Sequence, residues 1–557
     1  MHPRLIILLL CAALAFCAAP PEFDLVVRGG EVLDGTGQEA LRVDVGIAGD
    51  RITAIGDLSE RRAGETIDAA GKVVAPGFID TQGQSGTTLL ADGNGESHIR
   101  QGITSEIIGE GSSPAFWTKT TADVEALQRF GLAFDWTTPE GYFDTLEDRG
   151  ISINLGTLVP ATMARREVVG LENRTATADE LRRMEELVDR AMRAGAFGLS
   201  SALIYPPGSY ADTSELVALA RVASRHKGVY VSHVRGESFR VEEAVAEAIR
   251  IGDEAKLPVV IFHLKVAARP QWGSMGKIGA MIAAAIARGQ LVSATQYPYT
   301  AGGTGLLAVL PGWAQEGGRP QTIARLNDPS LRARIRREIE TTIDGWENLV
   351  AGAGFEGIQI ASLPPQADPS LLGKRLSQIA AERGEDPWDT LFRLLVETDG
   401  RVGALYHMMS EDDVRTAMQY GFVTIGTDAA ALRPDGELGR GQPHPRAYGT
   451  FPRVLGRYVR EHQVIELREA VRRMTSLAAA QYNIPRRGIL REGYYADLVV
   501  FDPATVIDRA TYEAPHQYPA GIDYVIVNGV VTITPAGHTG ARAGRRLAGP
   551  GARPTGS

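Results

Sequence analysis

Short apolar segments alternate with amphipathic segments along most of the chain. Eight apolar runs have the length of buried strands: "VVAPGFID", "TSEIIGEG", "ISINLGTLV", "GAFGLSSAL", "GVYVSHV", "VVIFHLKV", "LVSATQYPY" and "FVTIGTDA". Stretches with the helical period, such as "SELVALARVASRH" and "VEEAVAEAIRIGDEA", separate several of these runs. Eight β-α units predict an α/β fold, a (β/α)8 TIM-like barrel over residues 75–485.

A doubly wound parallel sheet is the structural alternative for the same pattern. It is disfavoured because no Gly-rich phosphate-binding turn follows the first apolar run. Residues 301–400 separate the seventh run from the eighth and predict an inserted helical subdomain.

Both ends of the chain have the pattern of short antiparallel strands. From Asp24, "DLVVRGGEVLDGTGQEALRVDVGIAGDRITAIG" alternates apolar and polar residues between Gly and Asp turns, and "DYVIVNGVVTI" repeats that pattern near the other end. We therefore expect a small β-sandwich built from residues 24–74 and 486–540. The tail, residues 541–557, is rich in Arg, Gly and Pro and is expected to be loosely ordered.

The first residues, "MHPRLIILLLCAALAFCAAPPEF", are typical of a secretory signal peptide, with one Arg, an apolar stretch and then small residues. Cleavage after residues 1–19 would give a secreted, periplasmic protein. Lipoprotein anchoring at Cys17 is the weaker alternative, because bulky Phe16 precedes the cysteine. Both cysteines, Cys11 and Cys17, lie in this segment. A metal site in the mature chain would therefore use His, carboxylate and water.

Composition restricts the class of partner. The chain has 557 residues, enough for a large core, with 22% charged residues and a net charge of −9. Such a balance offers no basic surface for nucleic acid, and after the N-terminal segment no apolar run is long enough to cross a membrane. A small-molecule partner is expected, while the oligomeric state is not determined by these features.

Reactive side chains gather at the predicted strand ends, where barrel enzymes carry their chemistry. In strand order they are Gln82 and Gln84, Glu110, Tyr205, His233, His263 with Lys265, Tyr297, and Asp428. A single histidine after a strand is commonly structural, but His233 and His263 follow neighbouring strands and could converge on one Zn²⁺.

The remaining polar residues suit a hydrolase. Asp428, in "TIGTDAA", is either a helix N-cap or a general base beside the ion. Lys265, Arg446 and the hydroxyls of Tyr205 and Tyr297 could bind a carboxylate, the alternatives being surface charge for the arginine and core packing for the tyrosines. No G-x-S-x-G or P-loop motif supports Ser-based hydrolysis or phosphoryl transfer.

Several motifs together resemble one family over nearly the whole chain. "DLVVRGGEVLDGTG", "KVVAPGFID", "YVSHVRGES", "PVVIFHLKV", "YPYTAGGT", "PHPRAYGTFPRVLGRY" and "GYYADLVVFDPATV" are similar to the N-acyl-D-amino-acid deacylase (D-aminoacylase) branch of the amidohydrolases. The resemblance implies a metal-dependent hydrolase in which His233 and His263 bind the metal and Asp428 is the catalytic acid and base. It assigns Tyr205, Lys265, Tyr297 and Arg446 to the substrate carboxylate.

Two departures from the family pattern affect the metal site. The family's paired histidines after strand one are Gln82 and Gln84 here, and its metal-binding cysteine would fall near Gly111. Our hypothesis is that Glu110 supplies the replacement ligand and that one zinc ion remains. The two glutamines either act as hydrogen-bonding groups behind the ligands or fill the vacated space.

The leading interpretation is an amidohydrolase that uses metal-activated water to cleave the amide bond of an N-acyl amino acid or of a dipeptide-like compound. The amino acid is expected to be the D enantiomer. The alternative is a non-catalytic barrel of the same fold that has lost metal ligands and binds a ligand or partner. The acyl group, the side-chain preference and D versus L selectivity do not follow from the sequence.

Overall fold

The computed structural model describes residues 21–116, 127–341 and 345–552. The predicted signal peptide and its cleavage site lie outside the described residues. Within the described residues, no helix combines the length and apolar character needed to cross a membrane.

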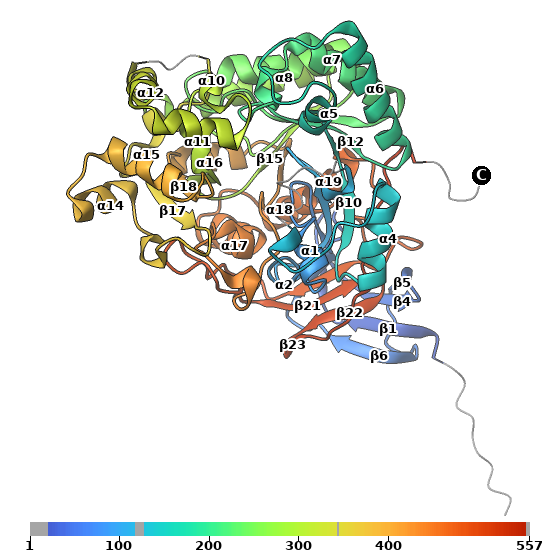
Figure 1. The fold of residues 1–557 in the computed structure, drawn as a ribbon. Helices are drawn as coiled ribbons and strands as arrows, with labels where there is room; N and C mark the ends of the chain where they lie inside the picture. Colours follow the sequence, from blue (N-terminus) through green and yellow to red (C-terminus); the bar gives the residue numbers. More distant parts are fainter. Residues whose placement is uncertain (1–20, 117–126, 342–344, 553–557) are drawn as a thin grey trace, which may run out of the picture.

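Parallel strands form the barrel at the centre of the molecule (Figure 1). In chain order they are β8 (Phe78–Asp80), β9 (Ile103–Ile108), β10 with its continuation β11 (Asn154–Thr157 and Val159–Pro160), β12 (Gly198–Ala202), β13 (Val229–His233), β14 (Val259–Ile261), β15 (Val292–Gln296) and β19 (Val423–Ile425). Each lies in one of the eight predicted apolar runs or extends at most one residue beyond it, and each pairs in parallel with its neighbour within the two sheets that make up the barrel wall. The predicted fold class is confirmed.

The barrel closes where the segment after β19 meets the segment after β8. Gly83 bridges Ala429 in parallel, and the Asp428 N–H donates to the Gln82 carbonyl at 2.8 Å. The buried Asp80 carboxylate accepts the N–H of Gln82 at 3.0 Å. The closure therefore holds Gln82 and Asp428 in fixed positions relative to each other.

Helices with one apolar face cover the barrel wall. They include α4 (Pro139–Arg149), α5 (Ala161–Val168), α6 (Ala178–Arg193), α7 (Thr213–Arg225), α8 (Val241–Ala255), α9 (Met275–Ala287), α16 (Glu411–Met418), α18 (Leu467–Met474) and α19 (Ser476–Gln481). In α8, Val241, Ala244, Val245 and Ala248 recur at helical spacing and are buried, which fixes the face that packs on β14. The helix ends where Lys256 adopts a left-handed backbone with φ of 56°.

Both ends of the chain build the predicted β-sandwich (Figure 1). One sheet is β5 (Arg51–Gly56), β4 (Asp44–Ala48), β1 (Phe23–Arg28) and β6 (Ala63–Asp68). The other is β23 (Gly537–His538), β22 (Val530–Thr534), β21 (Ile522–Val527), β20 (Leu498–Phe501), β7 (Val73–Pro76), β2 (Glu31–Val32) and β3 (Leu41–Arg42). Leu25 and Ile47 from one sheet pack with Leu498 and Ile526 from the other, so neither end can bury its apolar face alone.

The insertion between β15 and β19 contains strands as well as helices. Its helices are α10 (Gly312–Gln315), α11 (Arg319–Asn327), α12 (Pro329–Thr341), α13 (Leu349–Ala353), α14 (Leu376–Arg383) and α15 (Pro387–Glu397). The antiparallel sheet β16 (Ala301–Gly305), β18 (Gly403–His407) and β17 (Ile358–Ser362) was not predicted. The sequence of β16 is "AGGTG", whose glycines have low strand propensity and hide the strand.

The expectation of a loosely ordered tail is wrong for residues 541–552. The Leu155 N–H of β10 donates to the Arg545 carbonyl at 2.9 Å, and the Leu547 N–H donates back to Leu155 at 2.7 Å. Leu547 is buried, and the Gly549 N–H donates to the Gly195 carbonyl at 2.8 Å. Although the tail has few apolar residues, it satisfies backbone groups of β10 that would otherwise be unpaired.

Candidate metal centre

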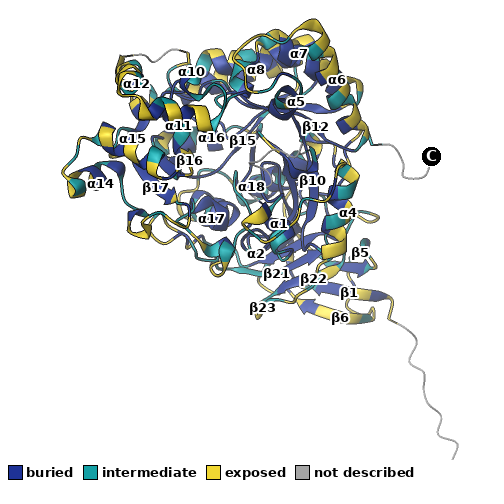
Figure 2. Cartoon of the chain, viewed as in Figure 1, coloured by how far each residue is buried: buried dark blue, intermediate teal, exposed yellow. Residues whose placement is uncertain are grey.

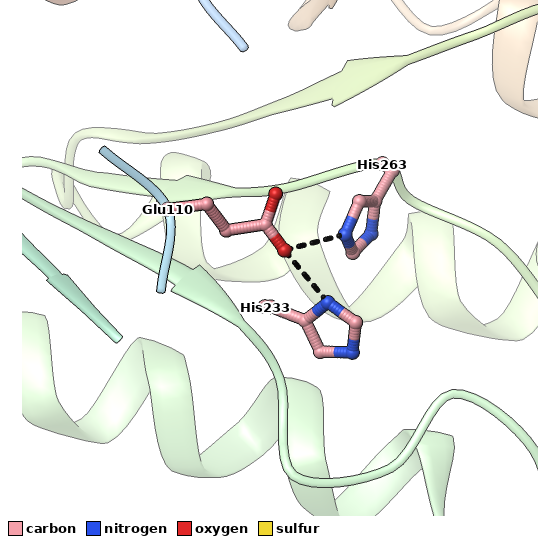
Figure 3. A group of neighbouring side chains, drawn as sticks. All are labelled: Glu110, His233 and His263. Carbon is pink, nitrogen blue, oxygen red and sulfur yellow. Dashed lines mark hydrogen bonds and ion pairs between the residues drawn. The ribbon is translucent and has the colours of Figure 1, made fainter. Parts of the chain in front are cut away.

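Three predicted ligands converge at the carboxyl ends of the barrel strands (Figure 3). Glu110 follows β9, His233 ends β13 and His263 follows β14. Glu110 Oε1 lies 2.9 Å from His233 Nδ1 and 3.3 Å from His263 Nε2. One ligand atom from each residue lies within 4.8 Å of the others, and all three side chains are buried. The strands in the interior of the molecule are buried, and exposed residues lie mainly on the outer faces of the helices (Figure 2).

The donor set fits zinc, which accepts imidazole nitrogen and carboxylate oxygen and keeps one position open in catalytic sites. Burial raises the pKa of Glu110, but His263 and His233 outweigh burial and hold that pKa well below its usual range. Burial and Lys265 lower the pKa of His263, yet the surrounding carboxylates raise it to about 9. Glu110 is therefore ionised and can serve as an oxygen ligand for a cation.

Gln82 and Gln84 hold the Glu110 carboxylate in place. The Nε2 atoms of both glutamines donate to Glu110 Oε2, at 3.3 and 3.0 Å, so that Oε1 faces the two histidines. Gln82 Oε1 accepts the His263 N–H at 3.2 Å and also the Thr295 hydroxyl. These contacts favour a hydrogen-bonding role behind the ligands over simple filling of space.

We expect Gln84→Ala to weaken zinc binding by about 10-fold, because loss of a group that orients a ligand typically costs 10 to 100-fold in affinity. Competition with a chromophoric chelator measures the effect. Gln290→Ala is the control, since its amide donates to the Ile249 carbonyl away from the centre. Equal zinc affinity in Gln84→Ala and wild type would contradict this role.

Asp428 stands next to these glutamines, between Gln84 and Arg446. Its Oδ1 lies 3.5 Å from Gln84 Nε2, and its Oδ2 lies 2.8 Å from Arg446 Nη1. Burial raises the pKa of Asp428, with Arg446 opposing that shift. Asp428 and His263 both have left-handed backbones, with φ of 49° and 36°, a strained conformation that their surroundings enforce.

The predicted carboxylate binders line the same cavity, of about 260 Å³. Lys265 Nζ lies 2.6 Å from Glu237 Oε1, so this lysine, like Arg446, is already paired with a protein carboxylate. The Tyr297 ring lies near both cations, 5.5 Å from Lys265 Nζ and 4.6 Å from the Arg446 guanidinium. The Tyr205 hydroxyl donates to Thr304 Oγ1 at 2.9 Å.

Glu237 is a site residue that the sequence reasoning missed. It is buried, lines the cavity and lies 2.8 Å from His263 Nδ1. Burial raises its pKa, but Lys265 and the two histidines hold that pKa well below its usual range. Its place in the sequence, four residues after His233 in the loop "HVRGE", does not distinguish it from a surface glutamate.

Comparison with known proteins places this geometry in a family. The model of the amidohydrolase family, Amidohydro_3, matches residues 65–533, and the chain therefore belongs to that family. The predicted metal-dependent amide hydrolase is confirmed at this level, and the non-catalytic alternative is not favoured.

Within the family, the chain is similar to the D-amino acid deacylases. It is 36% identical to the D-aminoacylase of Alcaligenes xylosoxydans xylosoxydans over 529 residues, covering 94% of this chain and 98% of that protein. A crystal structure of D-aminoacylase superposes with a TM-score of 0.77 at 36% identity and covers 94% of this chain and all of its own. The N-acyl-D-glutamate deacylase of Bordetella bronchiseptica, solved with zinc and a phosphonate inhibitor, is 32% identical with a TM-score of 0.78, covering 94% and 99% of the two chains.

Proposed function

We propose that this chain hydrolyses the amide bond of N-acyl-D-amino acids with one zinc ion held by Glu110, His233 and His263. The observation that carries the proposal is the convergence of these three donors in a cavity that also contains two cations. The similarity to D-aminoacylase and N-acyl-D-glutamate deacylase supports the substrate class.

Zinc in this position would lower the pKa of a water ligand and polarise the amide carbonyl. A glutamine amide is a poor zinc donor, and both glutamine Nε2 groups point to Glu110, so within the described residues this centre offers ligands for one ion. Work on a D-aminoacylase that is 36% identical describes one-metal activation and second-metal attenuation in that enzyme.

Asp428 is assigned the proton transfer. A carboxylate beside the site accepts the proton of the attacking water and delivers it to the leaving nitrogen as the C–N bond breaks. Arg446 and Gln84 hold the two carboxylate oxygens of Asp428. The products are the acyl carboxylate and the free amino acid.

Lys265 and Arg446 are assigned the substrate carboxylate. An incoming carboxylate would share each cation with its present partner, Glu237 or Asp428, and charge-assisted hydrogen bonds favour that arrangement. The hydroxyls of Tyr205 and Tyr297 remain protonated, because loss of contact with water raises the pKa of each well above its usual range. Each can therefore donate a hydrogen bond to the same group, Tyr205 by turning its hydroxyl away from Thr304 Oγ1.

Hydrolysis of an N-acetyl-D-amino acid, its L enantiomer and its C-terminal amide tests the proposal. The acid should be cleaved with a kcat/KM about 10 to 100-fold above its amide, since hydrogen bonds to a charged group contribute about 1.5 to 3 kcal/mol. The D enantiomer should be preferred. Equal rates on acid and amide would show that the two cations serve structure, and cleavage of the L enantiomer alone would contradict the substrate class.

A further inference from the structure

Two side chains of opposite hydrogen-bonding character contact the same nitrogen of His263. Glu237 Oε1 lies 2.8 Å from His263 Nδ1, and Lys265 Nζ lies 2.7 Å from the same Nδ1 atom. The carboxylate can only accept a hydrogen bond, whereas the ammonium can only donate one. The two contacts therefore require different protonation of Nδ1.

The choice between them decides whether His263 can bind a metal. If Glu237 is the partner, Nδ1 carries the proton and the lone pair of Nε2 is free on the side of Glu110. If Lys265 donates to Nδ1 of the neutral ring, the proton sits on Nε2 and blocks the ligand position. Within the described residues, Lys265 Nζ has hydrogen-bond contacts with these two groups, so a hydrogen bond to Glu237 competes with one to the imidazole.

We propose that Glu237 is a positioning residue that keeps His263 in the tautomer able to bind zinc, by accepting from Nδ1 and by engaging Lys265. The inference rests on the zinc site of the proposed function. A carboxylate behind a metal-binding histidine fixes its tautomer and raises its basicity in many zinc sites.

Contacts with two other segments hold Glu237 in this position. Its N–H donates to Glu347 Oε2 at 2.9 Å, and its carbonyl accepts the Ala267 N–H at 2.8 Å. Glu347 belongs to the insertion, just before α13, and is itself buried. The insertion thus supports the residue that sets the protonation of a barrel histidine.

Zinc dissociation constants of four proteins test the inference. Glu237→Gln should bind zinc about 10 to 100-fold more weakly than wild type, the usual cost of losing such a partner. In the Glu237→Gln, Lys265→Met double variant, removal of the competing donor should restore most of that affinity. Glu347→Gln is the matched control, because its amide oxygen can still accept the Glu237 N–H, and its zinc affinity should stay within about threefold of wild type.

The outcomes separate this inference from the proposed function. Wild-type protein that binds no zinc would overturn both. Zinc affinity of Glu237→Gln equal to wild type, or a double variant as weak as Glu237→Gln, would overturn the role of Glu237 alone. A general loss of packing would weaken the double variant further, so recovery of affinity is not expected from a structural role.

The protonation of the two His263 ring nitrogens can also be measured directly in wild-type protein. With histidine labelled by ¹⁵N, the zinc-loaded protein should show His263 with a protonated Nδ1 and a metal-bound Nε2. A spectrum in which His263 Nδ1 is unprotonated would overturn the inference.

Discussion

Replacement of Asp428 by asparagine is expected to lower kcat for an N-acetyl-D-amino acid by about 10² to 10⁴-fold, the usual contribution of a general acid and base. The amide cannot take the proton from water, although it fills the same space. Asparagine also tolerates the left-handed backbone at this position, φ of 49°, so the fold should be retained. Steady-state kinetics and zinc content of the purified variant measure both effects.

Asp435→Asn is a suitable control for that variant. Asp435 lies in the same segment after β19, is largely exposed and pairs with Arg433, so its loss should leave turnover unchanged. Turnover of Asp428→Asn within twofold of wild type would remove Asp428 from the mechanism.

Removal of zinc is expected to lower hydrolysis by at least about 10³-fold. A catalytic metal contributes several kcal/mol to the transition state, and about 1.4 kcal/mol corresponds to a tenfold change in rate. Titration of chelator-treated protein with zinc should restore activity, with the rise ending near one ion per chain. Protein that needs two tightly bound ions for activity would contradict the single-zinc proposal.

His263→Asn provides the corresponding variant. Asparagine accepts the left-handed backbone of His263, φ of 36°, but offers zinc only a weak amide oxygen. Zinc and activity should be lost together. His226→Asn is the control, since His226 pairs with Asp189 outside the centre.

The barrel could be predicted because its strands are buried on both faces. Such strands appear as continuous apolar runs, and the ends of parallel strands meet at one face, so Glu110, His233 and His263 could be grouped without coordinates. The three-stranded sheet of the insertion could not be predicted in this way, because β16 is mostly glycine.

The ion pairs between charged side chains at the site could not be predicted from the sequence pattern. Glu237 lies in the loop after β13, where a lone glutamate in "RGES" has the character of a surface residue. Its contacts with Lys265 and His263 depend on side-chain directions from two different loops. The ion pair of Arg446 with Asp428 likewise joins residues with no regular spacing.

The pairing of the tail with β10 also has a consequence for how the barrel assembles. Asn154 of β10 accepts the N–H of Arg545, a residue 391 positions later in the chain. Loop-closure entropy grows slowly with length, so this distance is a modest thermodynamic cost, but the contact cannot form before the tail has been synthesised. A chain that ends before Arg545 would leave these backbone groups of β10 without the tail as partner, and an unpaired strand edge is open to pairing with other chains.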